Sequence, residues 1–253
     1  MYFIVFIYGI VVGSFLNVCI WRIPRKESLV FPSSHCPTCN QSLKVRDLLP
    51  LMSYIISRGK CRYCKNKVPL QYPLVELANG LLWTLAFWRG GFSFTALEYC
   101  LMASLILTIS AIDLQHQIIP DELVITGLGI VFLFNVIYYI DSPEILLSSL
   151  GGGFLAGGFF LFLAVITKGG MGGGDIKLMA LLGFWLGWRP ILIVIFLSFL
   201  LGAIISIILM ILKIKGRKDM IPFGPFIGLA TLLTVFFGND IINYYITILI
   251  NYF

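Results

Sequence analysis

The chain has 253 residues, of which 59% are hydrophobic and 12% are charged, and its formal net charge is +6. Apolar stretches recur at close to the roughly 20 residues that a helix needs to cross a bilayer. This composition excludes an ordinary soluble fold and predicts an all-α polytopic membrane protein. The positive charge follows from membrane topology and contact with anionic lipid, so we expect no nucleic-acid partner.

Eight apolar runs are separated by short polar segments, and we predict that each is a transmembrane helix. They lie near residues 1–21, 72–89, 95–112, 121–140, 145–167, 176–188, 190–212 and 223–246. The first run has neither a basic start nor a small-residue cleavage site, so we expect a retained span and a mature chain that begins at Met1. The sixth run would rise only about 20 Å, against a hydrocarbon core of about 30 Å, so its start is expected to lie within the membrane.

The basic residues predict the orientation of the helices. We divide the chain into a first span (1–21), a small soluble module (22–71) and a transmembrane domain (72–253). If all eight runs cross, all but Arg89 and Arg189 of the 18 Lys and Arg residues lie on one side or at its edge. Lys and Arg concentrate in cytoplasmic loops, so we place that side, including the module, in the cytoplasm and the N-terminus outside.

Two CxxC pairs in the module predict a metal site. They are formed by Cys36, Cys39, Cys61 and Cys64. Cytoplasmic thiols stay reduced, and four thiolates in two such turns match a closed, structural zinc site with no open position for catalysis. His35 is a competing ligand that we place at the surface. A redox CxxC is the alternative, although the module is short for a thioredoxin-like unit.

Asp113 closes the third apolar run and is the first candidate catalytic residue. A carboxylate at membrane depth is costly unless it faces a partner or a cavity, which makes it a candidate functional group. The C-terminal end of its own helix also disfavours an anion. The alternative is that Asp113 merely ends its helix among lipid headgroups. Asp121 and Glu122 differ, because they follow Pro120 in the first turn of the next run, where acids complement the helix dipole.

Asp175 follows three glycines and is the second candidate. Glycine lets another backbone approach closely, which suits an extended peptide that enters a site. A phosphate cradle is the competing interpretation, but the loop has no Gly-Lys-Ser/Thr sequence. Two carboxylates within hydrogen-bond reach share a proton, and such a dyad can serve as base and acid in aspartic proteolysis. Which aspartate would be the base stays open, because a coupled pair titrates as a unit.

Six segments in chain order resemble the bifunctional type IV prepilin peptidases, also called leader peptidase and N-methyltransferase. They are residues 13–18, the two CxxC pairs with Arg58-Gly59-Lys60, residues 72–77, residues 113–121, residues 172–178 and residues 221–226. The Gly-x-Gly-Asp element also resembles the wider group that contains presenilins and preflagellin peptidases. The cysteine module and the N-terminal segment favour the bifunctional type.

The resemblance implies an activity and its residues. Family enzymes remove the basic leader from type IV prepilins or pseudopilins at the cytoplasmic face of the bacterial inner membrane. They then methylate the new amino terminus with S-adenosylmethionine. The family's catalytic aspartates fall on Asp113 and Asp175, and its zinc ligands fall on the four CxxC cysteines. No methyl-donor site can be derived, because the chain has no Rossmann fingerprint. Glu76 and Glu98 are candidate groups for binding an ammonium terminus. The alternatives are that Glu76 snorkels to the interface and that Glu98 lies near the outer surface.

Two other classes of function use some of the same residues. An ion- or proton-coupled transporter could use the two aspartates as a relay, but both lie on one predicted side and no inverted repeat is evident. A membrane-anchored zinc adaptor would explain the cysteines and leave the aspartates and the glycine loop without a role.

Overall fold

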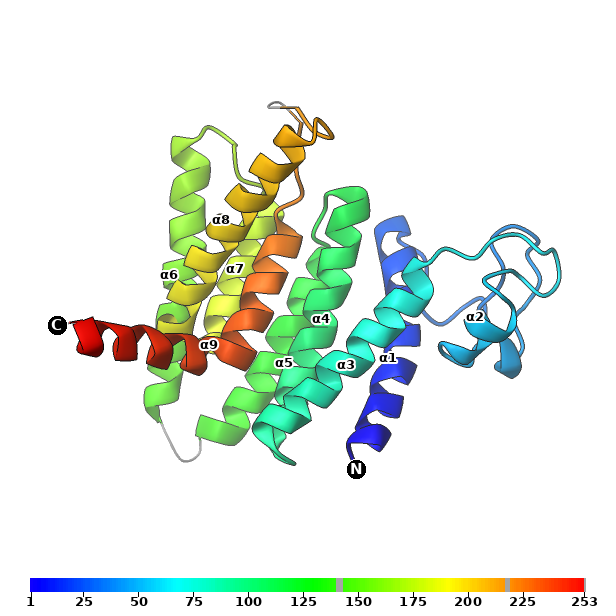
Figure 1. Ribbon diagram of the computed structural model, residues 1–253, viewed down its shortest axis with the longest axis horizontal. Coiled ribbons are helices and arrows are strands. Elements are labelled where there is room, and N and C mark those ends of the chain that lie inside the picture. The colour runs from blue at the N-terminus through cyan, green and yellow to red at the C-terminus, as the bar shows by residue number, and fades with distance from the viewer. Residues whose placement is uncertain (140–142, 217–218, 253) are drawn as a thin grey trace. The chain divides into compact units, whose positions relative to one another are not determined.

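The computed structural model describes residues 1–139, 143–216 and 219–252, and this part of the chain is helical apart from loops and two isolated β-bridges (Figure 1). The long helices are α1 (Tyr2–Arg22), α3 (Gln71–Gly90), α4 (Phe94–His116), α5 (Asp121–Tyr139), α6 (Pro143–Ile166), α7 (Gly173–Leu186), α8 (Trp188–Ile211) and α9 (Gly224–Tyr252). Short helices η1 (Ile23–Arg25), η2 (Val45–Asp47) and α2 (Met52–Ile56) lie between α1 and α3. The all-α prediction is confirmed.

Each predicted apolar run corresponds to one long helix. Several helix ends differ from the prediction, and two of them concern the candidate aspartates. Helix α4 continues to His116, and α7 begins at Gly173, so both candidate aspartates are helical rather than in loops. After α4 the chain turns at Gln117, whose φ of 55° is the left-handed conformation common just past a helix end. Residue 140, the predicted end of the fourth span, lies outside the described residues, as do Arg217 and Lys218 of the charge count.

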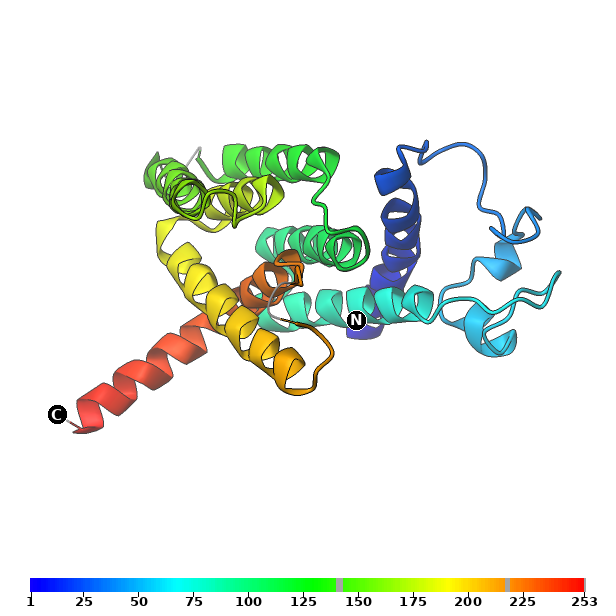
Figure 2. The same cartoon turned by 90° about the horizontal axis from the view of Figure 1, so that it is seen from above.

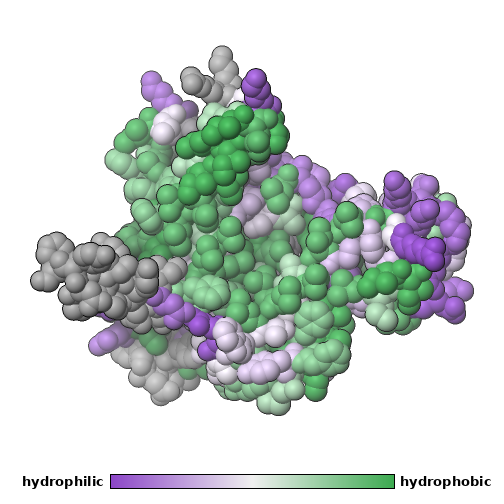
Figure 3. All heavy atoms as spheres, viewed as in Figure 1, coloured by the Kyte–Doolittle hydropathy of each residue, from purple (hydrophilic) through white to green (hydrophobic). Residues whose placement is uncertain are grey.

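Four of the described helices are by themselves long and apolar enough to cross a membrane, namely α1, α4, α6 and α8. In α6 and α8 only 22% of the apolar window is buried within the protein. Figure 3 shows hydrophobic residues over most of the visible surface of the helices, while hydrophilic residues gather over the cysteine module. Such outward-facing apolar surface is suited to lipid rather than to water.

The chain divides into two compact units, residues 1–108 and 109–253, and α4 runs from the first into the second. In the first unit, α1 and α3 cross each other in close contact (Figures 1 and 2). Glycines make this contact close, since a Cβ added at Gly13 would lie 2.7 Å from the Cα of Glu76. The division into residues 1–21, 22–71 and 72–253 stays a prediction.

In the second unit, α6 packs along α7, and α8 packs against α9 (Figures 1 and 2). A chain of aromatic rings fixes the start of α9. The ring of Phe199 on α8 lies with its centroid 5.6 Å from that of Phe160 on α6 and 5.4 Å from that of Phe223. Phe223 directly precedes α9, so these contacts hold the beginning of that helix in place.

Candidate functional site

The carboxylate of Asp113 lies at the N-terminal end of α9. Its Oδ2 accepts a hydrogen bond of 2.8 Å from the backbone N–H of Gly224, the first residue of α9, and Asp113 is only 5% exposed. The first N–H groups of a helix have no partner within the helix and carry partial positive charge. The N-terminal end of α9 therefore stabilises the negative charge of Asp113, which the C-terminal end of its own helix, α4, disfavours.

Gly224 has no room for a side chain. A Cβ added there would lie 2.7 Å from Oδ2 of Asp113 and 3.1 Å from its Cγ. Glycine lets the α9 backbone approach the carboxylate closely enough for the hydrogen bond to form. The side-chain position of Asp113 thus depends on the residue type at 224.

The carboxylate of Asp175 is held by its own helix. Asp175 is half-buried in the first turn of α7, and the backbone N–H of the N-cap residue Gly172 donates a hydrogen bond to it. This arrangement is the acidic half of a capping box. Capping alone would account for an acid here, but the carboxylate also interacts repulsively with that of Asp113. The structure therefore brings the two predicted residues into one electrostatic neighbourhood.

The segments that carry the two aspartates touch each other directly. Lys177 Nζ lies 2.7 Å from Oδ1 and 3.0 Å from Oδ2 of Asp121 in an exposed ion pair. A Cβ added at Gly174 would lie 2.9 Å from the Cβ of Ile119. The end of the glycine loop thus packs on the segment that follows α4. Two carboxylates held in this way have the groups needed for paired acid and base catalysis.

The two CxxC pairs form two knuckles of the same shape. The N–H of Cys36 donates to the carbonyl of Gln41 (3.0 Å), and the N–H of Cys61 donates to that of Asn66 (2.8 Å). The residue after the second cysteine has positive φ in both, 53° at Asn40 and 64° at Lys65. Each turn points both of its thiols to one side, as metal knuckles require.

The four cysteine sulfurs fit a tetrahedral metal. The Sγ atoms of Cys36, Cys39, Cys61 and Cys64 all lie within 4.8 Å of one another, and those of Cys36 and Cys64 are 3.9 Å apart. Zn–S bonds of about 2.3 Å in a tetrahedron place sulfurs roughly 3.8 Å apart. Burial raises the pKa of the Cys36 thiol, but hydrogen bonds from the Cys39 and Thr38 backbone outweigh it and lower the pKa to about 6. A thiol that ionises readily is suited to metal binding.

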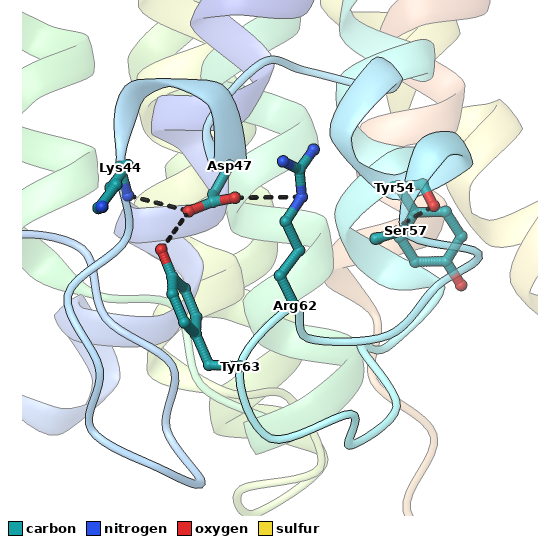
Figure 4. A network of polar contacts seen from close by, with 6 residues as sticks. All are labelled: Lys44, Asp47, Tyr54, Ser57, Arg62 and Tyr63. Atoms are coloured by element: carbon teal, nitrogen blue, oxygen red, sulfur yellow. Dashed lines mark hydrogen bonds and ion pairs between the residues drawn. The ribbon is translucent and has the colours of Figure 1, made fainter.

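Asp47 braces the second knuckle, which carries Arg62 and Tyr63 between its cysteines (Figure 4). Its Oδ1 lies 3.2 Å from Nε of Arg62, and its Oδ2 accepts hydrogen bonds from the Tyr63 hydroxyl (2.9 Å) and the Lys44 N–H (3.1 Å). Burial raises the pKa of Asp47, whereas the Lys44 N–H, the Tyr63 hydroxyl and the Arg62 charge lower it, and the net effect is a pKa below the usual value.

Comparison with known proteins places the chain in one family. Residues 7–90 match the Bacterial Peptidase A24 N-terminal domain, and residues 100–207 match the Type IV leader peptidase family. The "Prepilin leader peptidase/N-methyltransferase" of Legionella pneumophila is 35% identical, over 97% of this chain and 94% of the relative. The protein of the same name from Bacillus subtilis (strain 168) is 33% identical, over 96% of this chain and 97% of the relative. The chain belongs to the prepilin leader peptidase/N-methyltransferase family. No solved structure matches it significantly.

Membership of the prepilin leader peptidase/N-methyltransferase family confirms the resemblance drawn from the sequence. The N-terminal family match encloses all four knuckle cysteines, and the second match encloses both Asp113 and Asp175. The protein is therefore a multi-pass membrane protein of the bacterial A24 family. Gly224 lies beyond the range of the second match.

The sequence predicted a candidate role for Glu76 but none for Gly224. Gly224 belongs to a segment noted only for its resemblance, and its bond to Asp113 was not foreseen. The signal was a glycine between Pro222 and Pro225 at a helix start, which indicates a constrained backbone. Glu76 is 7% exposed and accepts a hydrogen bond of 2.8 Å from the N–H of Leu51, so its carboxylate is buried within the protein rather than extended into solvent.

Proposed function

We propose that this protein is a membrane-embedded aspartic endopeptidase that removes the basic leader from prepilins or pseudopilins and N-methylates the new amino terminus. The observation that carries the proposal is similarity over nearly the whole chain to relatives named prepilin leader peptidase/N-methyltransferase. The meeting of Asp113 and Asp175 within one compact unit supports the peptidase half.

In cleavage, the two carboxylates share one proton. The ionised aspartate takes a proton from a water molecule, which attacks the scissile carbonyl carbon, while the protonated aspartate donates to the carbonyl oxygen. The tetrahedral intermediate then collapses, the C–N bond breaks, and the departing amine takes up a proton. No covalent enzyme intermediate is formed. The N–H groups of Gly224 and Gly172 orient the two carboxylates before substrate arrives.

The glycine loop before Asp175 is suited to admit an extended peptide. Gly172 and Gly173 are exposed, and a Cβ added at Gly173 would meet no other atom within 4 Å. The substrate backbone can therefore approach the carboxylate without displacing enzyme side chains.

We place the dyad at the cytoplasmic membrane face, with eight crossings and the N-terminus outside. The Lys and Arg asymmetry supports this orientation. Helix α7 has 14 residues and rises about 21 Å, less than a hydrocarbon core of about 30 Å, so its start at the glycine loop lies below the membrane surface. A prepilin has an apolar helix preceded by a charged leader, so its scissile bond reaches the same depth.

We assign zinc to the cysteine module and S-adenosylmethionine to the methyl transfer. Cys36, Cys39, Cys61 and Cys64 would hold the metal with no open position, so the metal stabilises the module rather than activating water. S-adenosylmethionine supplies an electrophilic methyl group when it is bound. The bilayer and the prepilin are the partners that this assignment requires.

The test combines both activities in one assay. Purified protein in detergent is mixed with a prepilin-like peptide and S-adenosylmethionine, and the masses of the products are measured by mass spectrometry. The wild type should release the leader and add one methyl group, and Asp113→Asn and Asp175→Asn should each abolish leader release. Asp121→Asn, in an exposed ion pair, is the matched control and should stay active. Cleavage by either dyad variant at the wild-type rate would refute the dyad, and an intact peptide with the wild type would favour a transporter.

A further inference from the structure

The first unit contains a cavity of about 250 Å³ that the proposed cleavage does not use. It lies where the end of α1, the cysteine module and the start of α3 meet. Its wall includes Asn17, Trp21, Tyr54, Tyr72 and Glu76. Sites for small molecules run from roughly 300 to 1,000 Å³, so this cavity lies just below that range.

The wall contains a buried polar atom that lacks a partner. Asn17 is 4% exposed, and its Nδ2 donates to the carbonyl of Tyr72 at 3.0 Å. Within the described part of the chain, no donor reaches its Oδ1. Asn79 lies on the same α1–α3 contact and shows the ordinary arrangement, since its Nδ2 donates to the Gly9 carbonyl (2.7 Å) and its Oδ1 accepts from Ser104 (2.8 Å). An unpaired buried acceptor is costly, so a ligand donor that reached the Oδ1 of Asn17 would be favoured.

A buried carboxylate lies in the same wall. Glu76 is 7% exposed, and its Oε2 accepts the N–H of Leu51, which has a φ of 59° that leucine rarely adopts. Ser14 also hydrogen-bonds the carboxylate. These partners are neutral. The wall also contains Arg22, Lys60, Arg62 and Lys67, but no contact described for Glu76 joins its carboxylate to any of these cations. A buried carboxylate in a cavity attracts a positively charged ligand.

We propose that this cavity binds S-adenosylmethionine, an inference that rests on the proposed methyltransferase activity. The donor carries a sulfonium group, which the charge of Glu76 attracts. Its adenine and ribose carry N–H and O–H donors for the Oδ1 of Asn17. Trp21 and Tyr54 add aromatic surface to the wall for a purine or the sulfonium, although the Arg25 guanidinium lies over the Trp21 ring, 3.7 Å from its centroid.

The decisive experiment separates the charge of Glu76 from its structural bond. Equilibrium dialysis of the full chain in detergent measures the affinities of S-adenosylmethionine and of S-adenosylhomocysteine, which lacks the sulfonium charge. Glu76→Gln keeps an oxygen for the Leu51 N–H and removes only the charge. We expect it to weaken S-adenosylmethionine binding about tenfold or more and S-adenosylhomocysteine binding much less. Glu122→Gln, which removes an exposed acid outside the cavity wall, is the control and should leave the ratio of the two affinities unchanged.

A second variant pair tests Asn17 independently. Asn17→Leu should weaken both ligands by a similar factor, whereas Asn79→Leu should lower thermal stability without changing the affinity of the folded protein. Ultraviolet crosslinking of radiolabelled S-adenosylmethionine should label peptides from residues 14–22 or 54–76. An unchanged affinity ratio in Glu76→Gln, or label confined to residues 109–253, would overturn the proposal.

Leader cleavage distinguishes a failure of this inference from a failure of the proposed function. If the wild type cleaves and methylates but the ratio is insensitive to Glu76→Gln, the donor binds elsewhere and only this inference falls. If the wild type neither cleaves nor methylates, the proposed function fails and the donor site falls with it. A phospholipid that copurifies with the wild type, is lost in Asn17→Leu and is not displaced by the donor would assign the cavity to a lipid headgroup instead.

Discussion

The backbone N–H of Gly224 donates a hydrogen bond of 2.8 Å to Oδ2 of Asp113, and these residues are separated by 111 positions in the chain. The bond joins the last turn of α4 to the first residue of α9. It requires close approach, because a side chain on residue 224 would overlap the carboxylate.

Gly224→Ala should therefore inactivate the peptidase. The new Cβ would lie 2.7 Å from Oδ2 of Asp113, so the carboxylate must move. A misplacement of about 1 Å at a catalytic group can cost roughly 100-fold in rate, and we expect a loss of that size in leader release with helix content retained. Gly158→Ala, on an exposed part of α6 where a Cβ meets nothing within 4 Å, is the control and should stay active. Equal rates in the two variants would show that the carboxylate position is not critical.

Alanine substitutions at Gly173 and Gly174, the two glycines before Asp175, should affect leader release differently. A Cβ at Gly174 would lie 2.9 Å from the Cβ of Ile119, whereas a Cβ at Gly173 meets nothing within 4 Å. Gly174→Ala should shift the start of α7 away from Ile119 and slow leader release by about tenfold or more. Gly173→Ala should leave the start of α7 in place, so a loss of rate in this variant would come from crowding of the substrate backbone. A larger loss for Gly173→Ala would mean that substrate, not Ile119, occupies this space.

The cysteine module should contain about one zinc per chain, measured by plasma emission spectroscopy of protein purified under reducing conditions. Cys36→Ser with Cys61→Ser should remove the metal and expose the module to protease, because so small a module has little core of its own. Cys19→Ala is the control, since Cys19 is buried in α1 outside the cluster. Full zinc content in the double variant would refute the site.

Asp47→Asn should weaken metal retention without removing a ligand. Residues that support metal ligands typically change metal affinity about 10- to 100-fold, and Asp47 holds both Arg62 and Tyr63 of the second knuckle. Its pKa is lowered by folding, so its contribution is present in full above the ordinary carboxyl pKa and is lost as the pH falls through the lowered value. Zinc transfer to a chelator at pH 7.5 should be faster in Asp47→Asn, and Tyr63→Phe should show a smaller effect. Identical release from all three proteins would contradict the bracing role.

The exposed ion pair of Lys177 and Asp121 should contribute little to the free energy of unfolding. Surface ion pairs are worth about 0–1 kcal/mol, and both side chains are more than half exposed. A double-mutant cycle with Asp121→Asn and Lys177→Gln, followed by chemical unfolding in detergent, should give a coupling energy within that range. A larger coupling would indicate that the pair holds the two aspartate segments together.

Local patterns in the sequence were sufficient for the helices and for the choice of residue types. Hydrophobic runs of membrane length and short polar breaks predicted all eight long helices, because a backbone in lipid must satisfy its own hydrogen bonds. Two CxxC turns predicted the cysteine cluster, since ligand spacing within each knuckle is local. The pairing of Asp113 with Asp175 followed from chemistry, and from the resemblance, rather than from any spacing in the chain.

The partners of those residues were decided only by the tertiary structure. The prediction weighed Asp113 against the dipole of its own helix and could not include the opposing dipole of α9, which packing brings to the carboxylate. Asn17 and Asn79 look alike in sequence, yet of the two only Asn17, a residue of the cavity wall, has an unpaired oxygen. Hydrogen bonds between distant segments depend on how helices pack. That packing is a property of the whole chain rather than of any local pattern in it.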